Sequence, residues 1–145
     1  DALRREVVRA ASKAAARVLL PHAGEFRRVT GEVASPAAAR RAARRLGAVI
    51  VLKGPLTCVT DGSTVTHIPL GGPVLARGGS GDLLAGIVAA TVARRASLGL
   101  DVLGAVIAAT AWHGAAADWL SSREGESAVR TTQLLSGLSP ALRGR

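Results

Sequence analysis

Residues 48–53 of the chain, AVIVLK, form an unbroken apolar run that ends in a lysine. A short, continuous run rich in β-branched residues is typical of a parallel strand buried on both faces. Such a strand needs helices packed on its sheet. The run therefore predicts an α/β layered fold.

The residues around this run alternate between strand and helix patterns. RVLL at 17–20 predicts a second short buried strand, and Asp61-Gly62 between two alternating segments predicts a hairpin. Ser35 as N-cap and Pro36 as first helical residue predict where one helix starts. Further helices are expected over residues 2–16, from PHAGEF to near Gly31, after the glycines at 78–81, from about Asp101 to Leu120, and around 131–137.

The length and composition of the chain limit the kind of core it can bury and the cellular compartment in which we expect it. With 145 residues, one Phe, two Trp and no Tyr, the chain can bury a core, but only one made of Ala, Val, Leu and Ile. No apolar run reaches the roughly 18 residues of a membrane span, so no membrane partner is expected. Cys58 is the single cysteine and cannot form an internal disulfide, which indicates a cytoplasmic protein. Because the sequence has no methionine, we expect residues 1–145 to be a single partial domain of something longer.

The net charge of +9 comes almost entirely from arginine. The pairs Arg40/Arg41 and Arg44/Arg45 fall at i,i+4 spacing on one expected helix, which is the pattern of a solvated face. Basic clusters also bind phosphates of nucleic acids. However, aromatic stacking residues are almost absent and no groove-reading motif is present, so no specific nucleic-acid partner is expected.

The sequence GGSGD at residues 78–82 stands directly before a regular apolar helix pattern. Gly78, Gly79 and Gly81 allow close backbone approach to a ligand and can point successive N–H groups at one spot, while the helix adds its partial positive end. The loop therefore predicts an anion hole. Its pattern is neither the phosphate loop nor the dinucleotide fingerprint. Asp82 has two interpretations: it caps the helix, or it is a base beside the bound anion.

Three stretches together resemble a known family. The glycine loop resembles the GGxGD signature of the ribokinase-like superfamily. VIVLKGPLTCVTDG is similar to the LKG-x-x-T segment of nucleotide-dependent NAD(P)H-hydrate dehydratases within that superfamily, and LLPHAGEFRRVTG to their PH-x-GE motif. The initial DAL resembles the end of the family's D-A-D-A-L segment. The motifs follow the family's order along the whole chain, so the resemblance implies the carboxyl-terminal half of a ribokinase-like layered fold with a parallel sheet and a hairpin insertion.

The resemblance also implies roles for individual residues. Asp82 would be the catalytic base and touch the substrate, and His22 would bind the substrate. The nucleotide would be bound by two segments, one made of Lys53, Gly54, Pro55, Leu56 and Thr57 and the other of Gly78, Gly79, Ser80 and Gly81. Independently of the family, Lys53 and His22 both follow strands, where ligands gather in open α/β sheets. Glu25 is expected to be structural. His67 and His113 belong to no motif, and no metal site is expected.

The activity implied is repair of hydrated NADH and NADPH, in which the ring hydroxyl is phosphorylated and phosphate is then eliminated. The cofactors would be ADP or ATP with Mg²⁺, and the family's tendency to form tetramers implies a homo-oligomer. Two alternatives stay open. One is a small-molecule kinase of the same superfamily, acting for instance on a vitamin precursor alcohol. The other is a non-catalytic, truncated domain with a binding or assembly role.

Three positions depart from the family's pattern. Arg77 stands where a threonine usually precedes the two glycines, and Gly72 and Val74 replace the asparagine and glycine of the usual N-P-G. An arginine at this place would either bind phosphate more strongly or crowd the site.

Overall fold

The computed structural model describes residues 16–143. The chain divides into two compact units, Asp1–His67 and Ile68–Arg145. The helix predicted over residues 2–16 falls outside the described part of the chain.

The first unit is built on a four-stranded sheet in the order β1-β2-β3-β4. Strands β1 and β2 are parallel, and β2 and β3 are antiparallel. The predicted strands and the hairpin are confirmed. The sheet is mixed and not purely parallel, because the hairpin strands β3 and β4 join the sheet next to β2, and β3 runs antiparallel to β2. The bounds are Val18–Leu19 for β1, Val49–Leu52 for β2, Thr57–Thr60 for β3 and Val65–Ile68 for β4.

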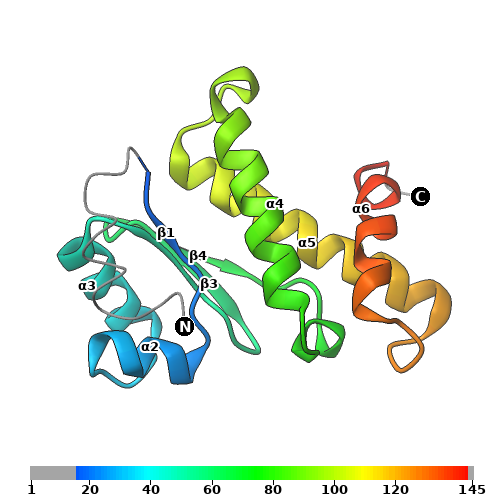
Figure 1. The fold of residues 1–145 in the computed structure, drawn as a ribbon, viewed down its shortest axis with the longest axis horizontal. Helices are drawn as coiled ribbons and strands as arrows, with labels where there is room; N and C mark the ends of the chain where they lie inside the picture. Colours follow the sequence, from blue (N-terminus) through cyan, green and yellow to red (C-terminus); the bar gives the residue numbers. More distant parts are fainter. Residues whose placement is uncertain (1–15, 144–145) are drawn as a thin grey trace. The chain divides into compact units, whose positions relative to one another are not determined.

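Two helices, α2 (Ala23–Thr30) and α3 (Pro36–Leu46), lie beside these strands (Figure 1). Ser35 caps α3 as predicted, since its Oγ accepts a hydrogen bond from the Ala38 N–H at 3.1 Å. The buried face of α3 consists of small side chains, which allow close approach to the strands. Phe26 of α2 is also buried. The core of the unit contains Leu19, Phe26, Ala38, Ala39, Ala42, Ala43, Ala48, Ile50, Leu52 and Cys58.

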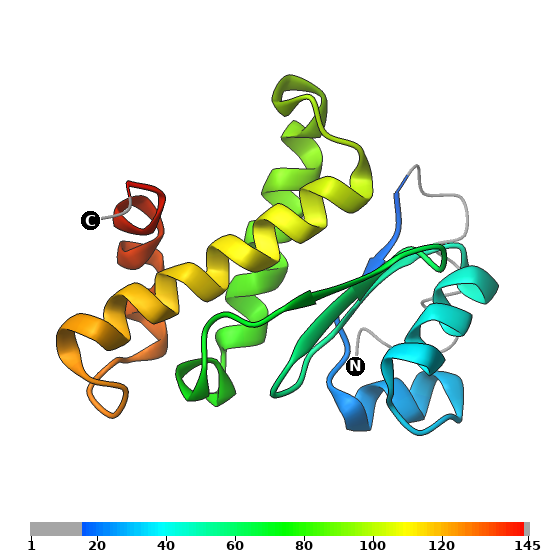
Figure 2. The same cartoon turned by 180° about the vertical axis from the view of Figure 1, so that it is seen from behind.

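The second unit is helical. Helix α5 packs against both α4 and α6 (Figure 2). It is capped by Asp101 and continues past Leu120, the expected end, until Gly125 ends it as C-cap. The core contains Val74, Ala117, Leu120, Val129 and Leu134. The elements are η2 (Pro73–Ala76), α4 (Ser80–Arg94), η3 (Arg95–Leu98), α5 (Val102–Glu124), η4 (Thr131–Gln133) and α6 (Leu134–Leu142).

Close packing in this unit depends on glycine at two places. A Cβ at Gly137 of α6 would lie 3.0 Å from the Ala116 carbonyl oxygen of α5, and a Cβ at Gly114 would lie 2.6 Å from the Leu70 Cβ. Across residues 16–143, none of the helices has the length and apolar character needed to cross a membrane.

Candidate functional site

The first group of candidate residues lies at the carboxyl ends of β1 and β2. Just beyond the two strands, His22 and Lys53 form a parallel bridge. The Lys53 N–H donates to the Pro21 carbonyl oxygen at 2.8 Å, which continues the strand pairing. The structure therefore brings His22 and Lys53 to the same edge of the sheet, although 31 positions separate them in the sequence.

Glu25 connects these two side chains. Its Oε2 accepts a hydrogen bond from the His22 N–H at 2.8 Å and completes a capping box at the start of α2. The same oxygen lies 3.7 Å from the Lys53 Nζ and 3.7 Å from the His22 Nε2. The structural role expected for Glu25 is present. The contact with Lys53 could not be seen in the sequence, because it depends on the parallel pairing of β1 with β2.

The His22 ring is oriented by the helix that it caps. Its Nδ1 accepts hydrogen bonds from the Gly24 N–H at 3.0 Å and the Glu25 N–H at 3.4 Å. An accepting Nδ1 carries no proton, so the neutral ring holds its proton on Nε2. The side chain is 59% exposed, which leaves Nε2–H available as a donor to a ligand.

The turn between β2 and β3 follows Lys53 directly. Gly54, Pro55 and Leu56 are all exposed, and a Cβ at Gly54 would meet nothing within 4 Å. The Thr57 hydroxyl donates to the Gly54 carbonyl oxygen at 3.4 Å and closes the turn. The turn therefore exposes its backbone at Gly54 and the side chain of Leu56, and binding of a nucleotide there stays a prediction.

The glycine loop lies in the second unit and leads into α4. Gly79 is the N-cap of α4 with φ +85°, a conformation that favours glycine. Gly81 is already in the helix and has no positive φ. Gly78 is exposed, and a Cβ on it would meet nothing within 4 Å. The loop is thus open on the side of Gly78 and sharply turned at Gly79.

Asp82 is the third residue of α4 and not its N-cap, and α4 has no side-chain cap hydrogen bond. The interpretation of Asp82 as a simple N-cap is therefore wrong. Its side chain is exposed in the first turn, where a carboxylate interacts favourably with the helix dipole.

Residues after α5 hold the glycine loop in place. The Thr131 hydroxyl donates to the Gly78 carbonyl oxygen at 3.1 Å. The Arg77 Nη2 donates to the Glu126 carbonyl oxygen at 2.5 Å. Arg77, the departure from the family's usual threonine, thus anchors the segment that follows α5. Sequence reasoning missed Thr131, and no local signal marks it, because its partner lies 53 residues earlier.

His113 is a second residue that the motifs did not explain. It lies in α5 with only 2% of its surface exposed, and among the residues described its Nε2 has no hydrogen-bond partner. Burial lowers the pKa of His113 to about 4 from an ordinary 6.5. The neutral ring is therefore the form that the folded chain contains near pH 7.

This burial predicts a loss of stability in weak acid. In the unfolded chain, His113 becomes protonated as the pH falls through 6.5. In the folded chain it stays neutral until the pH reaches about 4. The free energy of unfolding should then fall by up to about 1.4 kcal/mol per pH unit in this window. Chemical denaturation between about pH 7 and pH 5 measures the slope while Glu32 and Asp61, whose pKa values are lowered, stay ionised. The variant His113→Gln should lose most of this pH dependence of the free energy of unfolding. The control His67→Gln, at an exposed site, should keep it. An unchanged slope in His113→Gln would show that His113 is not its source.

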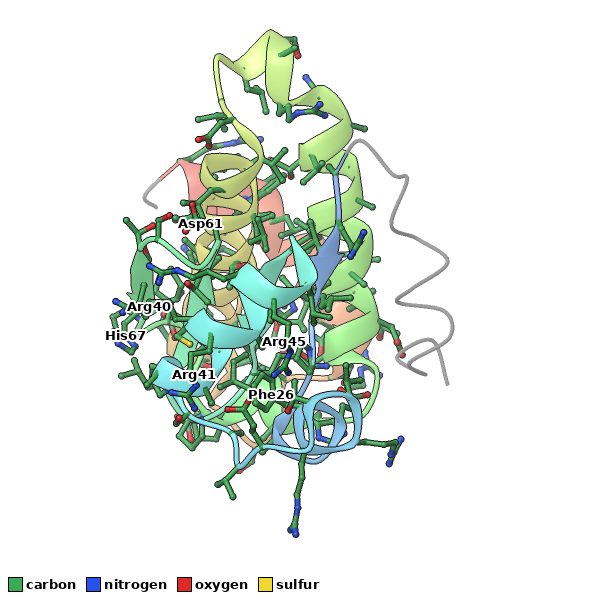
Figure 3. The ribbon with its side chains drawn as sticks, turned by 90° about the vertical axis from the view of Figure 1, so that its left-hand side faces the viewer. Phe26, Arg40, Arg41, Arg45, Asp61 and His67 are labelled. Atoms are coloured by element: carbon green, nitrogen blue, oxygen red, sulfur yellow. The ribbon has the colours of Figure 1, made fainter. Side chains whose placement is uncertain are left out.

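The arginine-rich face of α3 is largely engaged within the first unit. Figure 3 labels Arg40, Arg41 and Arg45 on this helix. Glu32 pairs with Arg41 at 2.7 Å and with Arg45 at 3.2 Å, and the hydrogen bond from Arg41 is the main reason why the pKa of Glu32 is lowered. These pairs support the interpretation of a solvated face. That no specific nucleic acid binds here stays a prediction.

Comparison with known proteins shows which family the chain belongs to. The model of the NAD(P)H-hydrate dehydratase family matches residues 1–140. The chain belongs to this family. It is 45% identical over 136 residues to the bifunctional NAD(P)H-hydrate repair enzyme Nnr of Gloeobacter violaceus, a match that covers 91% of this chain and 26% of that protein.

Solved structures show the same fold. The crystal structure of the ADP/ATP-dependent NAD(P)H-hydrate dehydratase from Bacillus subtilis, co-crystallized with ATP/Mg²⁺, matches with a TM-score of 0.77 and 29% identity, over 88% of this chain and 47% of that one. A ribokinase-like superfamily protein from Enterococcus faecalis matches with a TM-score of 0.75 at 24% identity, over 96% of this chain and 50% of that one. The fold is thus ribokinase-like, as expected. The chain spans from about a quarter to half the length of these relatives.

Proposed function

We propose that this chain carries the catalytic base and the nucleotide-binding segments of a dehydratase that uses ADP or ATP to convert hydrated NADH and NADPH back to NADH and NADPH. The observation that carries the proposal is the exposed Asp82 carboxylate in the first turn of α4, directly after the tight turn at Gly79. Membership of the dehydratase family over residues 1–140 supports it.

In the first step, Asp82 takes the proton of the hydroxyl on the hydrated ring. The hydroxyl oxygen attacks the terminal phosphorus of the nucleotide, and the bond from that phosphorus to its leaving oxygen breaks. The amides of Ser80 and Asp82 already donate to the carbonyls of Arg77 and Gly79. The amides of Gly78, Gly79 and Gly81 are therefore the ones that we expect to stabilise charge on the transferred phosphoryl group.

In the second step, the phosphorylated hydrate loses phosphate. The ring nitrogen releases electrons and the carbon–oxygen bond breaks. The adjacent carbon then gives a proton to water as the ring double bond forms. Phosphate leaves with the oxygen of the former hydroxyl. His22, whose neutral ring holds its proton on Nε2 and is largely exposed, is suited to hold a polar group of the substrate.

The nucleotide would be bound by Lys53 through its phosphates and by the turn over residues 54–57, of which Gly54, Pro55 and Leu56 are exposed. Within residues 16–143, no three His, Cys, Asp or Glu side chains are grouped so that they could hold a metal ion. Because Mg²⁺ is commonly bound through substrate phosphates and a few carboxylates, it fits this chain as an ion that arrives with the nucleotide.

The product of the reaction tests the proposal against its alternatives. The full-length protein should restore the absorbance of NADH from its hydrate, with consumption of ADP or ATP. Accumulation of a stable phosphorylated alcohol without NADH would indicate a small-molecule kinase instead. Neither product with either nucleotide would indicate a non-catalytic domain.

Replacing Lys53 by Ala should weaken nucleotide binding. The side chain is only 28% exposed, and losing a charge-assisted contact with phosphate costs about 1.5–3 kcal/mol, which is about a 10- to 150-fold loss of affinity. Calorimetric titration with ADP and ATP measures the effect, and thermal unfolding should show an intact fold. Arg40→Ala on the solvated face of α3 is the control. An unchanged affinity in Lys53→Ala would remove Lys53 from the site.

A further inference from the structure

The hydrogen bond from Thr131 to the glycine loop ends on the central peptide of a tight turn. Residues 77–80 form this turn, since the Ser80 N–H donates to the Arg77 carbonyl oxygen at 3.2 Å. Gly78 has no positive φ, whereas Gly79 has φ +85° and ψ −15°. These angles are those of a type II turn with Gly79 as its third residue.

A type II turn differs from a type I turn in the orientation of its central peptide, here the peptide between Gly78 and Gly79. Turning this peptide over changes ψ of the second residue and φ of the third, while the two ends of the turn stay in place. A glycine as third residue can adopt either sign of φ. The glycine loop by itself is therefore compatible with both orientations.

The Thr131 hydroxyl favours one of them, because it donates to the Gly78 carbonyl oxygen at 3.1 Å. The carbonyl and the N–H of a trans peptide point in opposite directions. The Gly79 N–H therefore points away from Thr131. This N–H is one of the three amides that the proposed function assigns to the transferred phosphoryl group.

The other orientation would reverse the dipole of this peptide. It would direct the Gly78 carbonyl oxygen to the side where the Gly79 N–H now points. An N–H stabilises negative charge on a phosphoryl group, whereas a carbonyl oxygen is itself partially negative and repels it. The hydrogen bond from Thr131 thus decides the sign of the partial charge on that side of the loop.

The position of Thr131 beside the turn is supported by two further contacts. A Cβ at Gly79 would lie 3.5 Å from the Thr131 Cγ2, so the methyl group of this threonine lies close to the third residue of the turn. The Arg77 Nη2 donates to the Glu126 carbonyl oxygen at 2.5 Å and joins the first residue of the turn to the same segment of the chain. The segment 126–131 is therefore attached to the turn at more than one point.

We propose that Thr131 is a positioning residue for phosphoryl transfer, which holds the Gly78–Gly79 peptide with its N–H toward the transferred phosphoryl group. The inference rests on the proposed function. A threonine that only ties the segment 126–131 to the loop would contribute to the stability of the fold and not to the rate of the chemical step. The rate constant and the melting temperature therefore separate the two roles.

Single-turnover conversion of hydrated NADH at saturating ADP or ATP measures the chemical step in the full-length protein. In Thr131→Val the rate constant should fall about 3- to 10-fold, the factor that one neutral hydrogen bond contributes to an equilibrium. Thr131→Ala should show the same loss, which excludes crowding by the added methyl group of valine as its cause. Thr131→Ser keeps the hydroxyl and should keep the unmodified rate constant. Because Thr131 lies outside the core of the second unit, thermal unfolding should show an intact fold in all three variants.

Thr91→Val is the matched control. The Thr91 hydroxyl also donates to a backbone carbonyl oxygen, that of Ile87 at 2.8 Å, but within α4 and not on the glycine loop. This variant should keep the unmodified rate constant. A lower melting temperature with an unchanged rate constant in Thr131→Val, or a loss of rate in Thr131→Ser or Thr91→Val as large as that in Thr131→Val, would overturn the inference and leave the dehydratase proposal standing. Failure of the unmodified protein to convert the hydrate would overturn both.

Discussion

Asp82→Asn in the full-length protein is expected to lower the turnover of hydrated NADH at least about 100-fold, the scale of losing a general base. The amide has the size of the carboxylate but cannot take the substrate's proton. Because Asp82 is exposed and α4 has no side-chain cap, the folding cost should be limited to the lost dipole interaction, about 0.3–1 kcal/mol. Single-turnover kinetics and nucleotide titration separate the lost chemical step from intact binding.

Asp101→Asn provides the control for this substitution. Asp101 also stands at a helix start, where its Oδ1 accepts the Gly104 N–H at 2.6 Å, and Asn is an equally good N-cap. This variant should keep full turnover. If Asp82→Asn turns over the hydrate at the unmodified rate, Asp82 is not the base, and the catalytic assignment fails even though the fold stands.

Gly78→Val should damage nucleotide binding without damaging the fold. A Cβ at this position meets nothing within 4 Å, so the side chain has space until a phosphate approaches the loop. The valine side chain should hinder the approach of the phosphate and weaken the free energy of nucleotide binding by about 1–3 kcal/mol, which is about a 5- to 150-fold loss of affinity. Calorimetry with ADP and ATP measures the loss, and thermal unfolding tests the fold.

Gly86→Ala is the comparison for this variant. Gly86 is an exposed glycine of α4 with open space around its Cβ position, and alanine there should stabilise the helix by about 0.5–1 kcal/mol without affecting nucleotide binding. Equal affinity in Gly78→Val and the unmodified protein would show that nucleotide does not approach the backbone at Gly78.

Features that depend on neighbouring residues could be predicted from the sequence. Ser35 and Pro36 gave the start of α3, and the run at 48–53 gave the central strand, because caps and apolar runs act locally. The predicted end of α5 near Leu120 is too early, because the helix continues through the polar residues that follow to its glycine C-cap at Gly125.

Features that depend on distant pairing could not be predicted. The mixed sheet follows from how β3 pairs with β2, and the contact of Glu25 with Lys53 follows from how β1 pairs with β2. His113 lies in a helix of predominantly apolar residues, where no polar face reveals which side is buried. The motifs thus predicted that His22 and Lys53 follow strands and that the glycines precede a helix, but not the partners that hold these residues. That they form one site stays a prediction.

Because Arg77 and Thr131 anchor the glycine loop, the loop would not keep its conformation if it were transferred to another protein without their partners. Its conformation depends on residues 126 and 131, which follow a 23-residue helix. A graft of GGSGD with α4 alone would leave both partners behind. A proteolytic cut in the exposed segment 125–128 would free the chain that supplies them. The smallest segment that keeps the partners of this loop therefore runs from Arg77 to Thr131, just before α6.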